Sequence, residues 1–212
     1  MGVLNSGAKG RKMNRKSEWT ILDEAHELLR AAVRGVPAGD MGKPTPCAEW
    51  TVAQVLQHAV GDQLAYAAAI TGGPGPEENP FTPSGTLSAA PEALVDAAVR
   101  AAADAWATVG KDARDVAVPM PPNTMTAETG AGACALDAAV HAWDIAVATG
   151  QGSPLVGTLA RALLPVARTV VIQPLRDYGA FGPVLADRPG DDDVATLLRF
   201  LGRDPEHPVA SA

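Results

Sequence analysis

Aromatic residues are scarce in this sequence. Phenylalanine, tryptophan and tyrosine make up 4 % of its 212 residues, although 47 % of the chain is hydrophobic. Alanine supplies much of that hydrophobic fraction, and alanine is the best helix former. The composition therefore suits closely packed helices lined by small side chains, in a chain long enough to bury a substantial core as one domain.

Cysteines and long apolar runs are also few. Two cysteines, Cys47 and Cys134, do not make a disulfide framework. No unbroken apolar run reaches the ~18 residues of a membrane span. No apolar segment follows the basic start of the chain, as it would in a signal peptide. We therefore expect a cytoplasmic protein without a membrane partner.

Positive charge is scarce outside the first residues. Residues 1–17 carry five of the 17 basic residues and no acidic residue, which leaves 12 basic against 24 acidic residues and a net charge of −12. Such a charge argues against nucleic acid as a partner of the folded part. We predict a disordered basic leader at 1–17, with a nucleic-acid-binding arm as the alternative, one domain at 18–205 and a tail at 206–212.

Hydrophobic residues recur at helical spacing in six segments of the chain. These predicted helices cover residues 18–34, 51–70, 91–109, 134–149, 155–171 and 192–201. Residues 110–130 are expected to be irregular, with a short strand at 115–118. Long antiparallel helices of this kind predict an all-α bundle whose sites are built from side chains that point inward from facing helices.

The second predicted helix has clear boundaries. Thr51 and Gln54 have the spacing of a capping box, and a pair of glycines ends the helix at residue 72. Gly61, inside this helix, is expected to let another helix approach closely. The segment 72–88 contains four prolines, and a loop of this length is usually either functional or disordered.

The helix at 134–149 carries an acidic residue and a histidine at a spacing that suits metal binding. Asp137 and His141 are four residues apart, so both lie on one face of the helix and can share a cation. A catalytic zinc-type site needs a third ligand and an open position. We predict that His58 is the third ligand, because it lies in the middle of an apolar helix where an imidazole needs a partner. Of the other histidines, His26 is expected to line the core edge and His207 to be solvated. The alternative is a buried hydrogen-bonded pair of Asp137 and His141, with His58 satisfied by a backbone carbonyl.

Two residues near this pair have open roles. Asp144 lies three residues beyond His141 and either orients a ligating imidazole from outside or pairs with an arginine such as Arg161 or Arg168. Cys134 lies one turn before the acidic ligand, where it can either reach the metal or pack as a small buried residue. The sequence assigns no catalytic residue.

Three separated segments carry the motifs of one family. They are PTPCAEWTV at 44–52, followed by a histidine at 58 and a glycine at 61; DAAVHAWDIAVATG at 137–150; and FGPV at 181–184 with LGRDP at 201–205. Taken in order, they resemble actinobacterial DinB-like metal-binding proteins, which are related to the N-terminal domain of mycothiol-dependent maleylpyruvate isomerase. The resemblance covers about residues 21–205.

The resemblance implies an up-down-down-up four-helix bundle, here with an additional C-terminal helical segment. It also implies a divalent metal, often zinc or nickel, with His58, Asp137 and His141 as the ligands. The isomerase branch has a glutamate where this chain has Asp137, so the metal would lie nearer this helix or be held less tightly. About sixty residues follow position 150, too few for a clear copy of the isomerase's C-terminal domain, so we do not expect maleylpyruvate isomerisation itself.

The implied function is a thiol-dependent transferase or isomerase. In this hypothesis the metal activates a small thiol, with mycothiol as the cosubstrate, for attack on an electrophilic substrate. The alternatives are a metal-dependent hydrolase and a non-catalytic metal-binding stress protein, and a homodimer is left open. A loop at 72–88 that is ordered over the metal would favour an enzyme.

Overall fold

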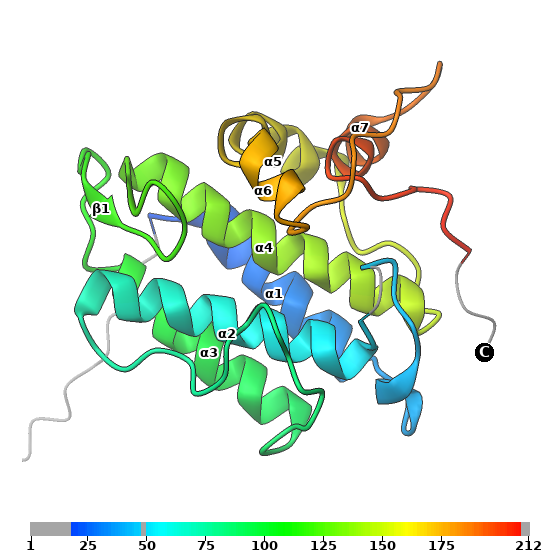
Figure 1. The fold of residues 1–212 in the computed structure, drawn as a ribbon, viewed down its shortest axis with the longest axis horizontal. Coiled ribbons are helices and arrows are strands. Elements are labelled where there is room, and N and C mark those ends of the chain that lie inside the picture. The colour runs from blue at the N-terminus through cyan, green and yellow to red at the C-terminus, as the bar shows by residue number, and fades with distance from the viewer. Residues whose placement is uncertain (1–17, 48–49, 209–212) are drawn as a thin grey trace, which may run out of the picture.

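The computed structural model describes residues 18–47 and 50–208, so the predicted leader and the end of the predicted tail lie outside the described residues. Four long helices form the bundle (Figure 1). They are α1 (Thr20–Arg34), α2 (Val52–Thr71), α3 (Pro91–Trp106) and α4 (Ala127–Ala148). In Figure 1, α1 and α4 run in one direction, and α2 and α3 run in the opposite one. The predicted all-α, up-down-down-up bundle is thus confirmed.

The helix α2 begins and ends where its sequence signals place it. The Thr51 side chain accepts a hydrogen bond from the Gln54 backbone N–H, and the Gln54 side chain accepts one from the Thr51 N–H at 2.9 Å. This capping box satisfies two N–H groups that the first turn leaves free. The helix ends at Gly72, whose left-handed conformation (φ 70°) glycine adopts at little steric cost.

The helix α4 begins earlier than predicted. Thr126 caps its N-terminus, so the helix starts seven residues before Cys134 and takes up the end of the segment expected to be irregular. A Cβ atom at Gly130 would lie 2.8 Å from the Trp106 ring, and one at Gly132 would lie 2.7 Å from Val166. These glycines therefore lie inside the helix because α3 and α5 pack against its backbone there.

The helix α4 is also the centre of the molecule. Of its 22 residues, 19 are buried, and it contacts α1, α2 and α5. By length and composition it is the one helix among the described residues that could cross a membrane, but 94 % of its apolar window is buried inside the protein. That burial is typical of a core helix.

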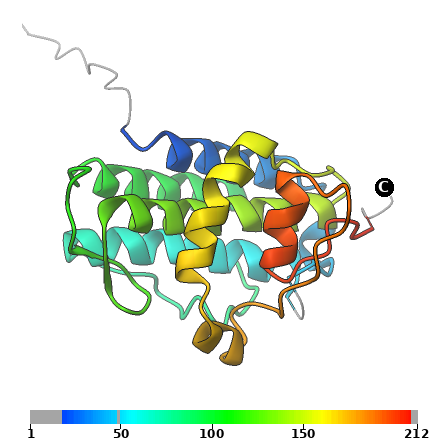
Figure 2. The ribbon, with the colours of Figure 1, turned by 90° about the horizontal axis from the view of Figure 1, so that it is seen from above.

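A smaller helical segment follows the bundle, as expected. It consists of the helices α5 (Gly157–Val170), α6 (Gln173–Asp177) and α7 (Asp193–Phe200). The helix α5 packs on α4 and crosses over the bundle helices in Figure 2, and α7 packs against α5. The short α6 was not predicted. The predicted strand is observed as β1 (Val116–Ala117), which pairs with β2 (Thr124–Met125), and one 3₁₀ turn, η1 (Asp40–Gly42), precedes α2.

Candidate metal centre

The structure brings the three predicted ligands together. His58 comes from α2, while Asp137 and His141 come from successive turns of α4. Oδ1 of Asp137 lies 3.6 Å from Nε2 of His58 and 3.4 Å from Nε2 of His141. The two imidazole rings are 4.7 Å apart, centroid to centroid, and nearly perpendicular. Two helices that are far apart in sequence therefore converge on one carboxylate oxygen.

Each histidine uses its other ring nitrogen outside the site. Nδ1 of His58 lies 2.8 Å from the backbone carbonyl oxygen of Pro80, and Nδ1 of His141 lies 3.0 Å from Oδ2 of Asp144. A hydrogen bond from Nδ1–H fixes the tautomer that leaves the Nε2 lone pair free for a metal. The carbonyl partner that the alternative hypothesis proposed for His58 is present, yet it leaves Nε2 directed at Asp137.

The spacing of the donor atoms suits a small divalent cation. The three ligand atoms all lie within 4.8 Å of one another, and two of the separations are 3.4 and 3.6 Å. A tetrahedral ion with bonds of roughly 2.0–2.1 Å separates its ligand atoms by about 3.4 Å. Because the ligand side chains are 8–13 % exposed, solvent reaches the group. Two imidazoles and one carboxylate therefore fit a metal with an open position.

Carboxylates surround His58. Burial alone would lower the pKa of His58, but its hydrogen bond to Asp137 and the charges of Asp62 and Asp137 raise that pKa to about 9. Oδ2 of Asp62 lies 3.7 Å from Nε2 of His58, and burial and the Asp137 charge raise the pKa of Asp62 to about 7. A proton on His58 offsets this negative charge in the metal-free protein, and a divalent cation can replace it.

Asp144 is fully buried between an imidazole and a guanidinium. Its oxygens accept two hydrogen bonds from Arg203, at 2.9 and 2.8 Å, in addition to the one from His141. Burial would raise the pKa of Asp144, but Arg203 and His141 lower it to about 2. Asp144 thus contacts both the imidazole and an arginine, but the arginine is Arg203; the suggested Arg161 instead pairs with Asp193 at 2.6 Å.

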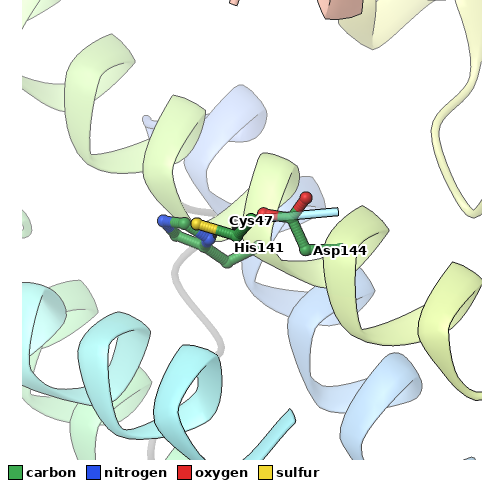
Figure 3. A group of neighbouring side chains, drawn as sticks. All are labelled: Cys47, His141 and Asp144. Atoms are coloured by element: carbon green, nitrogen blue, oxygen red, sulfur yellow. Dashed lines mark hydrogen bonds and ion pairs between the residues drawn. The ribbon is translucent and has the colours of Figure 1, made fainter. Parts of the chain in front are cut away.

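A second group of possible ligands shares one residue with the first. Figure 3 shows Cys47 beside His141 and Asp144, with donor atoms within 4.8 Å of one another. Burial and the charge of Asp144 raise the pKa of the Cys47 thiol to about 12. The Asp144 oxygens are already bound to Arg203 and to the His141 N–H. The group with His58 is therefore the better candidate for a metal site.

Cys134 lies outside both groups. It is buried, and its thiol donates a hydrogen bond to Oε1 of Gln63 at 3.1 Å. Burial raises its pKa well above the usual range. Of its two proposed roles, this environment matches that of a small buried packing residue.

The loop between α2 and α3 is ordered against α2 beside His58. Its Pro80 carbonyl binds His58, and the Gln57 side chain bonds to loop residues, including the Gly85 N–H at 2.7 Å. A Cβ atom at Gly61 would lie 2.8 Å from the Pro80 ring. The close approach predicted at Gly61 is thus made by this loop, and the prediction of a second helix there was wrong.

Aromatic side chains form a partly exposed surface beside His58. The Phe81 ring lies 5.6 Å from the His58 ring and 6.2 Å from the Tyr178 ring, and Trp50 lies 4.8 Å from His58. Phe81 is 45 % exposed and Tyr178 is 72 % exposed. Tyr178 follows α6, so the C-terminal segment forms part of this surface.

Helical bundles that build their sites from inward-pointing side chains of facing helices form a broad class, and the fold and candidate site place this chain in it. Within that class, this chain belongs to the family described as the mycothiol maleylpyruvate isomerase N-terminal domain, whose model matches residues 22–146. The matched span contains the three predicted ligands and Asp144, but neither Tyr178 nor Arg203.

Two relatives from Mycobacterium tuberculosis match over most of the chain. They are Uncharacterized protein Rv0738 of strain H37Rv and Uncharacterized protein MT0763 of strain CDC 1551. Each is 32 % identical over 185 residues, which cover 84 % of this chain and 93 % of the relative. No solved structure matches the chain.

Proposed function

We propose that this protein binds one divalent metal ion through His58, Asp137 and His141 and catalyses a thiol-dependent transfer or isomerisation. The observation that carries the proposal is the convergence of two Nε2 atoms on one carboxylate oxygen, while both Nδ1 atoms are bound elsewhere. The family name points to mycothiol as the small thiol. Low-molecular-weight thiols are kept reduced in the cytoplasm, where we place the protein.

A bound Zn²⁺ or Ni²⁺ would supply a Lewis acid that stabilises a thiolate at neutral pH. The chain's own residues supply the surroundings. Asp144 and the Pro80 carbonyl hold the two imidazoles in the tautomer that presents Nε2 to the site. The ordered loop forms a wall beside His58, which limits access of water from that side.

The aromatic surface beside His58 suits the second, electrophilic substrate. The exposed ring of Phe81 lies beside His58, and the exposed ring of Tyr178 lies beside Phe81. A planar or apolar group of a substrate can pack against such rings while its reactive atom faces the metal site. The ordered loop and this surface favour an enzyme over a metal-storage role.

A non-catalytic metal-binding protein is the second candidate. Two cavities of about 390 and 380 Å³ lie away from the ligands. The first lies between α4 and α7 beside Trp143 and Leu198, and the second lies between α2 and α3 beside Leu64 and Ala101. Neither cavity is lined by a predicted ligand, so neither would hold a substrate directly against the metal. Bound metal would therefore not by itself establish a reaction.

Metal content and thiol binding test the proposal in sequence. Elemental analysis of zinc-loaded protein should give one ion per chain, and His58→Ala and His141→Ala should lose it. Calorimetry of the loaded protein with mycothiol, in two buffers of different ionisation heat, should then show release of one proton per thiol bound. Bound metal without thiol binding at millimolar thiol would favour the hydrolase or the non-catalytic metal-binding protein. Absence of metal would reject these two alternatives and the thiol-dependent enzyme alike.

A further inference from the structure

Gln63 of α2 is fully buried and contacts Asp137 from the side away from the two ligand histidines. Its Nε2 donates to Oδ2 of Asp137 and to the backbone carbonyl of Cys134, both at 3.2 Å. Its Oε1 lies 2.8 Å from Nε2 of His26 and accepts a hydrogen bond from the Cys134 thiol at 3.1 Å. One side chain thus links α1, α2 and α4 immediately behind the acidic ligand.

These partners determine which way the amide of Gln63 points. The nitrogen end faces two acceptors, and the oxygen end faces two donors, so every hydrogen-bonding position of the amide is used. A flipped amide would place its oxygen against the Asp137 carboxylate and the Cys134 carbonyl. His26 is itself buried, and burial lowers its pKa to about 4, so it is neutral at pH 7 and its Nε2–H can donate.

From this geometry we infer that Gln63, anchored by His26, is the positioning residue that makes Asp137 a one-oxygen ligand. The amide holds Oδ2, while Oδ1 faces both Nε2 atoms of the ligand histidines. A carboxylate free of this bond could rotate and offer both oxygens to the same ion. The inference rests on the proposed function and explains how the site keeps a coordination position open for a thiol.

The substitution Gln63→Met tests this role. Methionine has a similar length but no amide, so Oδ2 of Asp137 loses its donor. Loss of such a partner behind a metal ligand typically weakens metal binding by ~10–100-fold. The matched control is Cys134→Ala, which removes the thiol bond to the same amide but leaves the Gln63 bond to Asp137 in place.

The measurement is the dissociation constant for Zn²⁺ by competition with a chelating indicator, together with the visible absorption of the Co²⁺-loaded protein. Circular dichroism of each metal-free variant establishes that it is folded. We expect Gln63→Met to weaken Zn²⁺ binding and to reduce the intensity of the Co²⁺ bands, as the coordination number rises. Cys134→Ala should change neither. A purely structural role of Gln63 would lower the melting temperature without altering the Co²⁺ spectrum.

A second variant covers the case in which Gln63→Met does not fold. His26→Leu keeps Gln63 but removes the nearer and stronger of the two donors to its amide oxygen, at 2.8 Å against 3.1 Å for the weakly donating thiol. The Co²⁺ spectrum should therefore shift in the same direction, with a smaller loss of affinity. Unchanged affinity and spectrum in both variants, with wild type that binds Zn²⁺, would overturn this inference alone. Wild type that binds no metal would overturn the proposed function and this inference with it.

Discussion

His58 and His141 present the same ring nitrogen to the candidate site, but they are held by different anchors. His141 is held by Asp144, which is fully buried in a two-point ion pair with Arg203. His58 is held by one backbone carbonyl, that of Pro80, in the loop between α2 and α3. One anchor is a buried charge network, and the other is a single hydrogen bond that the His58 ring donates to a carbonyl oxygen of a long loop.

The difference in anchors indicates that the position of the His141 ring is set by folding of the core, whereas the position of the His58 ring can change with the loop. The Asp144–Arg203 pair joins α4 to the segment after α7, so the His141 ring is fixed when the core forms. The His58 ring depends on the position of a loop whose neighbour Phe81 is exposed to solvent. We therefore expect substitutions on the His141 side to affect stability and those on the His58 side to affect metal and substrate binding.

Breaking the buried anchor should have the largest effect. Arg203→Met leaves the Asp144 carboxylate buried without its cation, and loss of one partner of a buried pair typically costs about 3–5 kcal/mol. Urea unfolding measures the loss. The double variant Asp144→Leu with Arg203→Met removes both charges, so it should recover much of the stability but not the metal affinity. The control Arg161→Met breaks an exposed ion pair and should change the stability little. Equal losses in Arg203→Met and Arg161→Met would contradict the assignment.

A third buried histidine, His26, sharpens the comparison because its partner is the neutral amide of Gln63. Burial lowers its pKa from 6.5 to about 4, so the folded state disfavours the proton that the unfolded chain takes up. The contribution of His26 to stability is therefore fully present above pH 6.5 and falls as pH drops toward 4, by on the order of 3 kcal/mol.

Denaturation of the metal-free protein at pH 7 and pH 4.5 measures this loss. The variant His26→Gln should be less stable at pH 7 but should show a shallower decline in stability toward acid. An unchanged decline in the variant would assign the acid sensitivity to other groups.

Removal of the metal should have the next largest effect. At a free metal concentration of 100 times Kd, binding stabilises the folded state by about 2.7 kcal/mol, so a strong chelator should lower the melting temperature of the loaded protein. His58→Ala should abolish the chelator-sensitive part and leave a folded bundle, because the core lies elsewhere. The melting temperature of metal-free wild type serves as the control. No response to the chelator in metal-loaded wild type would contradict metal-linked stability.

Displacing the loop anchor should have the smallest effect on stability. In Gly61→Ala the new methyl group would meet the Pro80 ring and move its carbonyl away from His58. The helix gains about 1 kcal/mol of propensity from alanine, so the melting temperature should change little while metal affinity falls.

The matched control is Gly110→Ala, because a Cβ at Gly110 meets no atom. The rate of proteolysis of the loop measures its displacement, and the Zn²⁺ dissociation constant measures the loss of metal affinity. Unaltered affinity and loop protection in Gly61→Ala would show that the loop does not hold His58.

Local patterns in the sequence predicted the helices and brought the residues of the candidate site into view, but they left the anchor of each histidine as one of several possibilities. The capping box at Thr51 and the four-residue spacing of Asp137 and His141 are short-range signals. Arg203 lies 59 residues beyond Asp144, and no periodicity links the two. The Pro80 anchor is a backbone atom, which leaves no mark in residue type. The start of α4 was missed because Gly130 lowers helix propensity, whereas close packing against Trp106 requires that glycine.

X-ray absorption spectroscopy of zinc-loaded protein, without added thiol, tests the central claim most directly. Ligation by His58, Asp137 and His141 predicts a first shell of nitrogen and oxygen at roughly 2.0–2.1 Å, with the outer scattering of two imidazoles and no sulfur. The group around Cys47 would instead give a sulfur shell at about 2.3 Å. A sulfur shell, or scattering from fewer than two imidazoles, would contradict the account.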